Sequence, residues 1–376
     1  MVMGTVLSHI DGEQMRLFQN SGIHSSYLIR LDELAAKNNG FEARRRQLVN
    51  DRFGALHFLK PVLEGDPNTF FTNGDDATLQ RAWAREHNVR QGDLAEILLA
   101  QIENHRTEIF YNTDPTRYDS SFVRRLPGCV KKTICWRAAP SGNVDLSAYG
   151  MVVCNFPSIL RDWRLKGCRA EYFYPAVDPE MDKYGDVERP IDILFVGGYS
   201  RHHSTRVKVL ESVATLSRDW NVVYCLDASR MTRLAESVAG LIFSRLRKLR
   251  RAEAIKRIAR APVFGRGLYQ LIGSAKIVLN GAIDMAGNDR GNMRCFEAMG
   301  CGALLLSDDG IYPEGMRDGE TMVTYTRPDE AVDLALQVLS NKEDRNRVAS
   351  RGREVVGELY NKNVQWKRFV EIVSLI

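Results

Sequence analysis

The apolar residues of this 376-residue chain fall into short β-rich runs that alternate with longer stretches of helical spacing. Such alternation is typical of a parallel sheet that carries helices on both faces. In the first half we predict strands at residues 15–19, 69–72, 108–112, 132–136, 150–155 and 171–174. Helices are predicted between them at residues 25–37, 43–63, 77–86 and 92–104. The first half is therefore expected to form an α/β domain.

The alternation stops at residues 175–190, a charged stretch with three prolines, and then starts again. We interpret this stretch as a linker. Beyond it we predict strands at 191–196, 221–226, 276–280 and 303–307, and helices at 205–216, 229–260, 292–299, 330–339, 342–359 and 366–376. The prediction is thus two doubly wound domains, residues 1–178 and 188–358, with a ligand at the carboxyl ends of the strands in the cleft between them.

The composition, 44% hydrophobic and 26% charged, is ordinary for a globular protein. No segment approaches the roughly 20 apolar residues that span a bilayer, and residues 1–20 lack the basic start and apolar run of a secretory signal. The seven cysteines are scattered, with no C-x-x-C pair and no Cys/His cluster at zinc-ligand spacing. This pattern is typical of reduced thiols in a core, so we predict a cytoplasmic protein without a bound metal.

Basic residues are concentrated in one stretch. Residues 245–260 hold eight Lys or Arg side chains against one acid, a charge of +7, so the remainder of the chain, which is +5 overall, carries −2. Apolar residues at 241–243, 246 and 249 give this stretch the character of an amphipathic surface helix. Two interpretations stay open, a solvated helix face and peripheral docking to an anionic membrane. Nucleic acid is not expected as a partner, because no recognition fold or aromatic ladder accompanies the charge.

The first candidate for chemistry is the end of the apolar strand at 191–196. Gly197 and Gly198 follow it, and a helix begins soon afterwards with Arg201 and Arg206 nearby. Glycines let the backbone approach a ligand closely, and a helix N-terminus and arginines attract phosphate. The alternative is a plain turn with solvated arginines. The stretch is not the G-x-G-x-x-G dinucleotide pattern, and no acidic residue is expected at the matching distance after a second strand.

The second candidate is a polar, glycine-containing loop between two buried strands. It leads into a two-turn helix at 292–299, for which Asn292 is a good N-cap. Glu297 lies on the helix face nearest the loop, where its carboxylate can accept two hydrogen bonds from ribose hydroxyls. Asp289 lies eight residues earlier in the loop. The alternative is a pair of solvated acids.

These residues carry a family resemblance. Asp289 and Glu297, with seven residues between them, resemble the paired acids of the E-x7-E motif in family-4-type retaining glycosyltransferases. The runs at 292–306, 197–206 and 79–84 are more similar to the bacterial CgeB-like branch of these proteins. The chain departs from the wider family at Asp289, where that family has Glu. Because the Asp side chain is shorter, the resemblance does not define the exact sugar contact.

The resemblance implies a GT-B fold, in which two Rossmann-like domains face each other across a cleft and a C-terminal helix, residues 359–376, crosses back to the first domain. It implies that Glu297 binds the donor ribose and Asp289 the sugar hydroxyls. Arg206 and Arg294 would hold the diphosphate. It also places the nucleotide base near Gly265 and Tyr269, although aromatic residues there can equally fill the core. The anomeric configuration would be retained.

The first half offers weaker signals. Ser21, Gly22 and His24 follow the first predicted strand and open a helix, so they would face the cleft on the acceptor side. Asp114 ends another strand at the same edge, and we include it as a catalytic candidate that binds acceptor or stabilises charge. An N-cap or turn role for Asp114 is equally open.

The predicted function is glycosyl transfer from a nucleoside-diphosphate sugar, UDP-sugar in preference to GDP-sugar, to a saccharide, a lipid-linked saccharide or another acceptor. Synthesis of a bacterial surface polysaccharide is the expected setting. No tightly bound cofactor is expected, and no metal, because the chain has no D-x-D motif and arginines can neutralise the leaving group. The alternatives are a nucleotide-sugar epimerase or hydrolase on the same fold, and a scaffold without activity.

Overall fold

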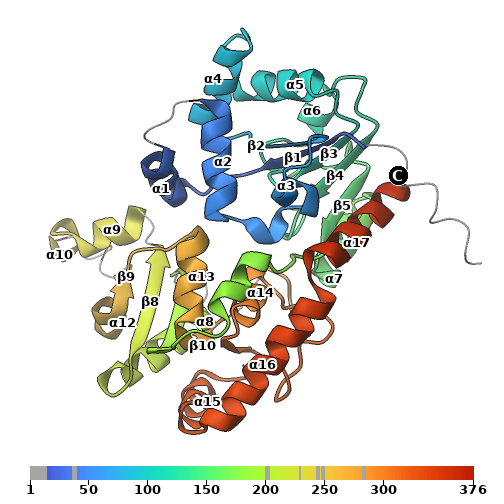
Figure 1. Cartoon of the computed structure of the whole chain (residues 1–376). Helices are drawn as coiled ribbons and strands as arrows, with labels where there is room; N and C mark the ends of the chain where they lie inside the picture. The colour runs from blue at the N-terminus through green and yellow to red at the C-terminus, as the bar shows by residue number, and fades with distance from the viewer. Residues whose placement is uncertain are drawn as a thin grey trace, which may run out of the picture.

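The computed structural model describes residues 15–35, 40–199, 204–227, 230–242, 246, 250–281 and 285–376. Two parallel sheets, each of six strands, organise this part of the chain (Figure 1). The first sheet has the order β2-β1-β3-β4-β5-β6. Its strands are β1 (Leu17–Ser21), β2 (Thr69–Asn73), β3 (Ile109–Asn112), β4 (Lys132–Trp136), β5 (Met151–Cys154) and β6 (Ala170–Tyr172). The strands predicted in the first half are confirmed to within two residues at each end.

The second sheet has the order β12-β11-β10-β7-β8-β9. Its strands are β7 (Ile191–Gly198), β8 (Val222–Asp227), β9 (Ala259–Arg260), β10 (Ala275–Leu279), β11 (Leu304–Asp308) and β12 (Val323–Tyr325). Strand order reverses direction at β1 in the first sheet and at β7 in the second, and ligands of doubly wound folds bind at such switch points. The predicted fold class of two Rossmann-like domains is confirmed.

Helices cover both sheets and lie in the connections between strands. In the first half they are α1 (Ser25–Ala35), α2 (Phe41–Asp51), η1 (Ala55–His57), α3 (Lys60–Glu64), α4 (Ala77–Glu86), α5 (Leu94–Asn104), α6 (Ser120–Val123), α7 (Pro157–Leu165) and η2 (Pro179–Tyr184). In the second half they are α8 (Ser204–Ala214), η3 (Thr215–Arg218), α9 (Arg230–Glu236), α10 (Ala239–Ile242), α12 (Glu253–Ile258), α13 (Gly265–Gly273), α14 (Met293–Gly300), α15 (Pro328–Ser340), α16 (Lys342–Leu359) and α17 (Lys362–Ser374).

Two predicted helices are wrong. The helix expected at 43–63 is divided, because Arg52 takes a left-handed φ of 66° at the end of α2 and Pro61 lies in the first turn of α3. Proline is favoured at a helix start and breaks a helix interior. The helix expected at 229–260 is replaced by α9, α10 and α12, and residues 259–260 instead form the edge strand β9, which pairs with β8. Residues 228–229, 243–245 and 247–249 of that stretch lie outside the described residues.

The terminal helix α17 returns to the first domain, as expected (Figure 1). Phe369, Ile372 and Val373 belong to the same apolar core as Phe110 of β3. Lys132 of β4 also donates to the carbonyl of Val373 at 2.7 Å. The predicted domain boundaries stay a prediction. No helix within the described ranges is long and apolar enough to cross a membrane.

The start of α17 fixes the turn η1. The buried Lys362 ammonium donates to the carbonyls of Ala55, Leu56 and Phe58 at 2.7, 3.0 and 2.8 Å. Gln365 adds a bond to the Leu56 carbonyl at 3.1 Å. Buried backbone carbonyls require such partners. The turn between α2 and α3 is therefore held in place by the other end of the chain.

Candidate functional site

Two neighbouring cavities are lined by residues from both halves of the chain, and Met293 lines both of them. The first, the glycine-turn cavity, has a volume of about 320 Å³. The second, the tryptophan cavity, has a volume of about 260 Å³. Both lie at carboxyl ends of strands, where the topology predicts ligands. Most of the residues singled out in the sequence belong to one of the two.

The glycine-turn cavity begins where β7 ends. A side chain added at Gly197 would lie 3.2 Å from the ring of Phe195 and 3.3 Å from the guanidinium of Arg206. Nothing lies within 4 Å of the position that a Cβ would take at Gly198, which lines the cavity. The two glycines therefore have different roles. Gly197 makes room for Arg206, and Gly198 leaves the cavity wall open to a ligand.

Arg206 lies in the first turn of α8 behind this wall, with its guanidinium carbon 5.2 Å from the centre of the Phe195 ring. Its Nε is buried without a hydrogen bond, and no ion pair joins it to the described residues. Burial lowers the pKa of Arg206, Tyr325 and Asp308 oppose that shift, and the neighbouring Arg294 adds to it. A buried cation without a carboxylate partner is unusual and suits an anionic ligand. Arg201, the other arginine predicted here, lies outside the described residues.

Arg294 and Glu297 lie together on α14 and both line the cavity. Arg294 Nη1 donates to Glu297 Oε2 at 2.5 Å, while Arg294 Nε is buried without a partner. Burial raises the pKa of Glu297, and the charge of Arg294 opposes that shift. One carboxylate oxygen is thus used by Arg294, and the arrangement leaves the other for a ligand.

Asn292 occupies the N-cap position of α14, as predicted, but its side chain makes no capping bond. Its amide donates instead to Asn280 Oδ1 at 3.1 Å. The free N–H groups at a helix start carry partial positive charge and attract anions. The start of α14 therefore adds to the positive character around Arg294.

The predicted base-binding residues lie at this cavity, but the interpretation of each changes. Gly265 has φ +60°, and a side chain there would lie 2.2 Å from the carbonyl oxygen of Asp51. The space next to Gly265 is thus filled by the end of α2. Tyr269 is 1% exposed in the core around α13, and burial raises its pKa. The core role that the sequence left open for Tyr269 is favoured over stacking on a base.

The loop after β1 lies at the same cavity. His24 lines it and is 3.5 Å from Asp227 Oδ2, and Ser26 Oγ donates to Asp227 Oδ1 at 3.1 Å. Ser21 and Gly22 line neither cavity; Ser21 is buried and its carbonyl accepts from Asn73. The acceptor-side assignment of this loop is therefore not supported. Asp227 also corrects a prediction, because an acidic residue does end the second strand of this domain.

Asp114 lines neither cavity. Its backbone N–H donates to Asn112 Oδ1 at 3.0 Å, and its carboxylate lies 3.4 Å from Arg117. These bonds are those of a turn, the alternative that the sequence left open, and the catalytic assignment of Asp114 stays a prediction. The neighbouring Asp75, which the sequence analysis missed, accepts from the Ile23 N–H, and burial raises its pKa to about 6.

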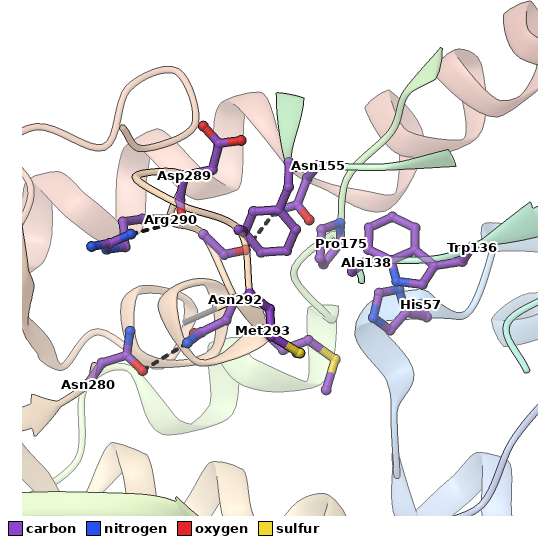
Figure 2. Close-up of a pocket in the computed structure, with 14 residues that line it drawn as sticks. His57, Trp136, Ala138, Asn155, Pro175, Asn280, Asp289, Arg290, Asn292 and Met293 are labelled. Atoms are coloured by element: carbon purple, nitrogen blue, oxygen red, sulfur yellow. Dashed lines mark hydrogen bonds between the residues drawn. The ribbon is translucent and has the colours of Figure 1, made fainter. Parts of the chain in front are cut away.

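Asp289 and Glu297 do not lie in one cavity. Asp289 lines the tryptophan cavity, where its Oδ2 accepts from the Ser158 N–H at 2.6 Å at the start of α7. Figure 2 shows its carboxylate on the far side of the cavity from Trp136 and His57. The acid predicted to bind sugar thus joins the two halves of the chain and has one carboxylate oxygen engaged by the backbone.

The remaining wall of the tryptophan cavity comes from the first domain. Trp136 ends β4, Asn155 and Phe156 follow β5, and His57 ends the turn η1. Arg52, which follows α2 shortly before this turn, lines the other cavity. Trp136, His57, Arg52 and Asp227 were missed in the sequence, because nothing in their local spacing separates them from core and surface residues of the same types.

Comparisons with known proteins bear on both domains. A family model described as glycosyl transferase-like matches residues 228–370, which is less than half of the chain. No curated protein matches the sequence. Among solved structures, HepE of Anabaena, in complex with UDP and glucose, matches with a TM-score of 0.56 and 12% identity over 96% of this chain and 100% of that one.

Two further structures cover similar lengths. A glycosyltransferase from Rickettsia africae matches with a TM-score of 0.50 and 12% identity, over 96% of this chain and 97% of that one. Sucrose-phosphate synthase from Thermosynechococcus elongatus matches with a TM-score of 0.50 and 12% identity, over 95% and 98%. At these identities the matches establish the fold, whereas the family model concerns the second domain. The chain therefore has the GT-B fold of these glycosyltransferases and carries a glycosyl transferase-like domain at residues 228–370.

Proposed function

We propose that this protein is a glycosyltransferase that takes its sugar from a nucleoside-diphosphate sugar, UDP-sugar in preference to GDP-sugar. The acceptor in this proposal is a saccharide or a lipid-linked saccharide. The observation that carries the proposal is the glycine-turn cavity, where Gly198, Arg294 and Glu297 line one wall and Arg206 lies behind it. HepE, which has the same fold, holds UDP and UDP-glucose in its solved complexes and supports the choice of base.

The diphosphate would lie between Gly198 and the start of α14. Two guanidinium groups serve this position, and the one on Arg206 forms no ion pair with the described residues, although the charge of Asp308 acts on it from a greater distance. Positive groups fixed before the reaction stabilise the charge that develops on a leaving diphosphate. These groups support transfer without a metal at the diphosphate.

The ribose would lie against Glu297. Arg294 holds one of its carboxylate oxygens, which fixes the rotamer and favours the ionised form that burial disfavours. An ionised carboxylate accepts hydrogen bonds from two neighbouring hydroxyls more strongly than a neutral group does. Glu297 is thus placed to recognise the ribose, and Arg294 to orient Glu297.

Several finer parts of the proposal rest on the family resemblance. These are retention of configuration, membership of the CgeB-like branch and a role in bacterial surface glycan synthesis. For Asp289 to bind the transferred sugar, it would use its free oxygen or release the Ser158 N–H. An epimerase or hydrolase would need an acid–base residue beside the sugar, and His24 faces Asp227 at the other cavity instead. No observation favours that alternative, or the scaffold, over the transferase.

Peripheral docking to an anionic membrane belongs to the same proposal. Large apolar side chains are exposed in this region, with Val238 in the turn between α9 and α10 at 72% and Ile242 at the end of α10 at 71%. They precede the basic stretch at 245–260, part of which lies outside the described residues. Apolar and basic side chains side by side suit the surface of an anionic bilayer. This arrangement supports a lipid-linked acceptor.

The test is a thermal-unfolding panel with UDP, GDP, ADP, CMP and NAD on the wild type and on Glu297→Gln, which keeps the shape and the Arg294 contact. A nucleotide at 100 times its Kd should stabilise the wild type by about 2.7 kcal/mol. UDP should give this shift, and Glu297→Gln should lose most of it. Glu358→Gln, at an exposed position of α16, is the matched control and should behave as wild type. A folded wild type that no nucleotide stabilises would refute the proposed donor site.

A further inference from the structure

The proposed nucleotide site does not occupy the tryptophan cavity. Its volume of about 260 Å³ exceeds the ~150 Å³ that encloses a benzene ring in an engineered protein cavity. Its walls are mainly apolar, with Phe156 and Pro175 on the first domain and Met285 and Met293 on the second. The cavity has room for one six-membered ring, and the polar part of its lining comes from His57 and Asn155 of the first domain and from Asn280, Asp289, Arg290 and Asn292 of the second.

Trp136 forms the aromatic wall. It is 8% exposed and lines the cavity, while its ring packs edge-on against Phe173 and at 4.5 Å from His57. These contacts fix the indole, and Figure 2 shows Trp136 and His57 together on the side opposite Met293. An aromatic face carries negative charge density and attracts C–H groups, such as those on one face of a sugar ring. The wall suits a ring with apolar faces and polar edges.

His57 supplies a polar group without a partner. Its Nδ1 is buried and forms no hydrogen bond within the described residues. Burial, together with the charge of Lys362, lowers the pKa of His57 to about 3, so the ring is neutral. A neutral imidazole offers one donor and one acceptor, and a sugar hydroxyl can take either role. Leaving a buried polar atom unpaired costs about 1–3 kcal/mol, which a bound hydroxyl would recover.

Hydrogen bonds from two other elements hold the backbone around His57 in place. Its carbonyl accepts from Gln19 Nε2 at 2.9 Å, and Lys362 holds the carbonyls on either side of it. The backbone that carries the imidazole is thus held by bonds to β1 and to α17. Because Met293 lines both cavities, a ring held here lies next to the space assigned to the diphosphate.

From this geometry we propose that the tryptophan cavity is a subsite for a sugar ring, which stacks on the Trp136 indole and binds His57 through a hydroxyl. The proposal rests on the proposed function. The shared chemistry is a pyranose ring, which has two possible sources, the acceptor and the sugar of the donor itself. His57 and Trp136 act in both cases as binding residues and take no part in bond cleavage.

The experiment compares Trp136→Leu and His57→Phe with Phe173→Leu. Phe173→Leu is the matched control, since Phe173 packs against Trp136 but lines neither cavity. Calorimetry measures the Kd of UDP, UDP-glucose, UDP-galactose and UDP-N-acetylglucosamine for each variant. A second series measures binding of the methyl glycosides of the same sugars in the presence of UDP, and turnover with each as acceptor.

UDP should bind all variants as it binds the wild type. If the ring belongs to the donor, Trp136→Leu and His57→Phe should weaken one UDP-sugar about tenfold, which corresponds to about 1.4 kcal/mol. If it belongs to the acceptor, the same factor should appear in a glycoside Kd or KM instead. His57→Asn restores a donor near the Nδ1 position and should recover part of the loss.

Two results overturn the subsite. The first is that Trp136→Leu and His57→Phe bind every UDP-sugar and every glycoside with the same Kd as the control Phe173→Leu. The second is that the wild type binds UDP, but no UDP-sugar binds more tightly than UDP and no glycoside binds beside it. A wild type that binds no nucleotide at all is a different result, because it refutes the proposed donor site first.

Discussion

The two cavities that meet at Met293 are made of different kinds of residue. The glycine-turn cavity takes its polar wall from short continuous stretches, with Gly197 and Gly198 after β7 and Arg294 and Glu297 one turn apart on α14. The tryptophan cavity is assembled from the ends of β4 and β5, the turn η1, the loop at Pro175 and the loop before α14. Charge and glycine mark the first, and core-type side chains line the second.

This difference reflects what each cavity would bind. A diphosphate needs cations and close backbone approach, so arginines and glycines in the sequence are enough to indicate the site. A sugar ring needs an aromatic face and one neutral polar group, which resemble an ordinary core until the fold brings them together. The segment between α2 and α3 contributes Arg52 to one cavity and His57 to the other, so the two depend on a shared support.

The largest effect should come from removing that support. Lys362→Met removes the ammonium that donates to the carbonyls of Ala55, Leu56 and Phe58, although the Leu56 carbonyl keeps its bond from Gln365. We expect a loss of about 2–4 kcal/mol in the free energy of unfolding, measured in urea, because unpaired buried acceptors are costly. Lys342→Met, at the exposed start of α16, is the control and should be neutral. Unchanged stability in Lys362→Met would mean that η1 holds its shape unaided.

A smaller effect, on the affinity for UDP, should distinguish the glycine-turn cavity from the tryptophan cavity. Arg206→Met keeps the packing on Phe195 and removes the charge. We expect the UDP affinity to fall about 30-fold, or about 2 kcal/mol, while uridine, which has no phosphate, binds as before. Stability should change little, since Arg206 forms no ion pair with the described residues and the methionine keeps the contact with Phe195. Calorimetry checks the affinities, with the exposed Arg218→Met as control. Equal losses for UDP and uridine would contradict the phosphate role.

The smallest effect is a pH dependence of stability that comes from His57 in the tryptophan cavity. Burial lowers the pKa of His57 to about 3, so below about pH 6.5 the unfolded chain takes up a proton that the folded chain refuses. Stability from His57 is therefore present above pH 6.5 and falls by about 1.4 kcal/mol per unit as the pH drops toward 3. His105, with a pKa of about 4, acts in the same direction, and Asp75, with a pKa raised to about 6, opposes it.

The measurement for this pH effect is the difference between wild type and His57→Phe in unfolding free energy at pH 7.0 and 5.5. His105 and Asp75 are common to both chains, so their contributions cancel. The wild type should lose about 1.4 kcal/mol more than His57→Phe over this interval. Equal slopes would show that His57 is protonated in the folded protein and would remove the neutral donor–acceptor that the sugar subsite needs.

The candidate site could be predicted in the second domain to the extent that its residues are close in sequence. Arg294 and Glu297 are three residues apart on one helix, and their pairing follows from helical geometry. Asp289 shows the limit of such reasoning. Its spacing from Glu297 resembles a motif, but the loop between them turns its carboxylate to Ser158 of α7, a partner 131 residues away. Gly265 is similar, because its neighbour Asp51 comes from the other domain.

The sequence by itself determined the two α/β domains and all their strands except β9 and β12, because hydrophobic periodicity is a local consequence of which faces are buried. It also identified the glycine turn and the Arg294–Glu297 helix. Only the tertiary structure decided that Asp289 and Glu297 line different cavities, that Asp114 forms a turn, and that Trp136 meets His57. Those outcomes depend on contacts between segments far apart in the chain, and no local pattern encodes such contacts.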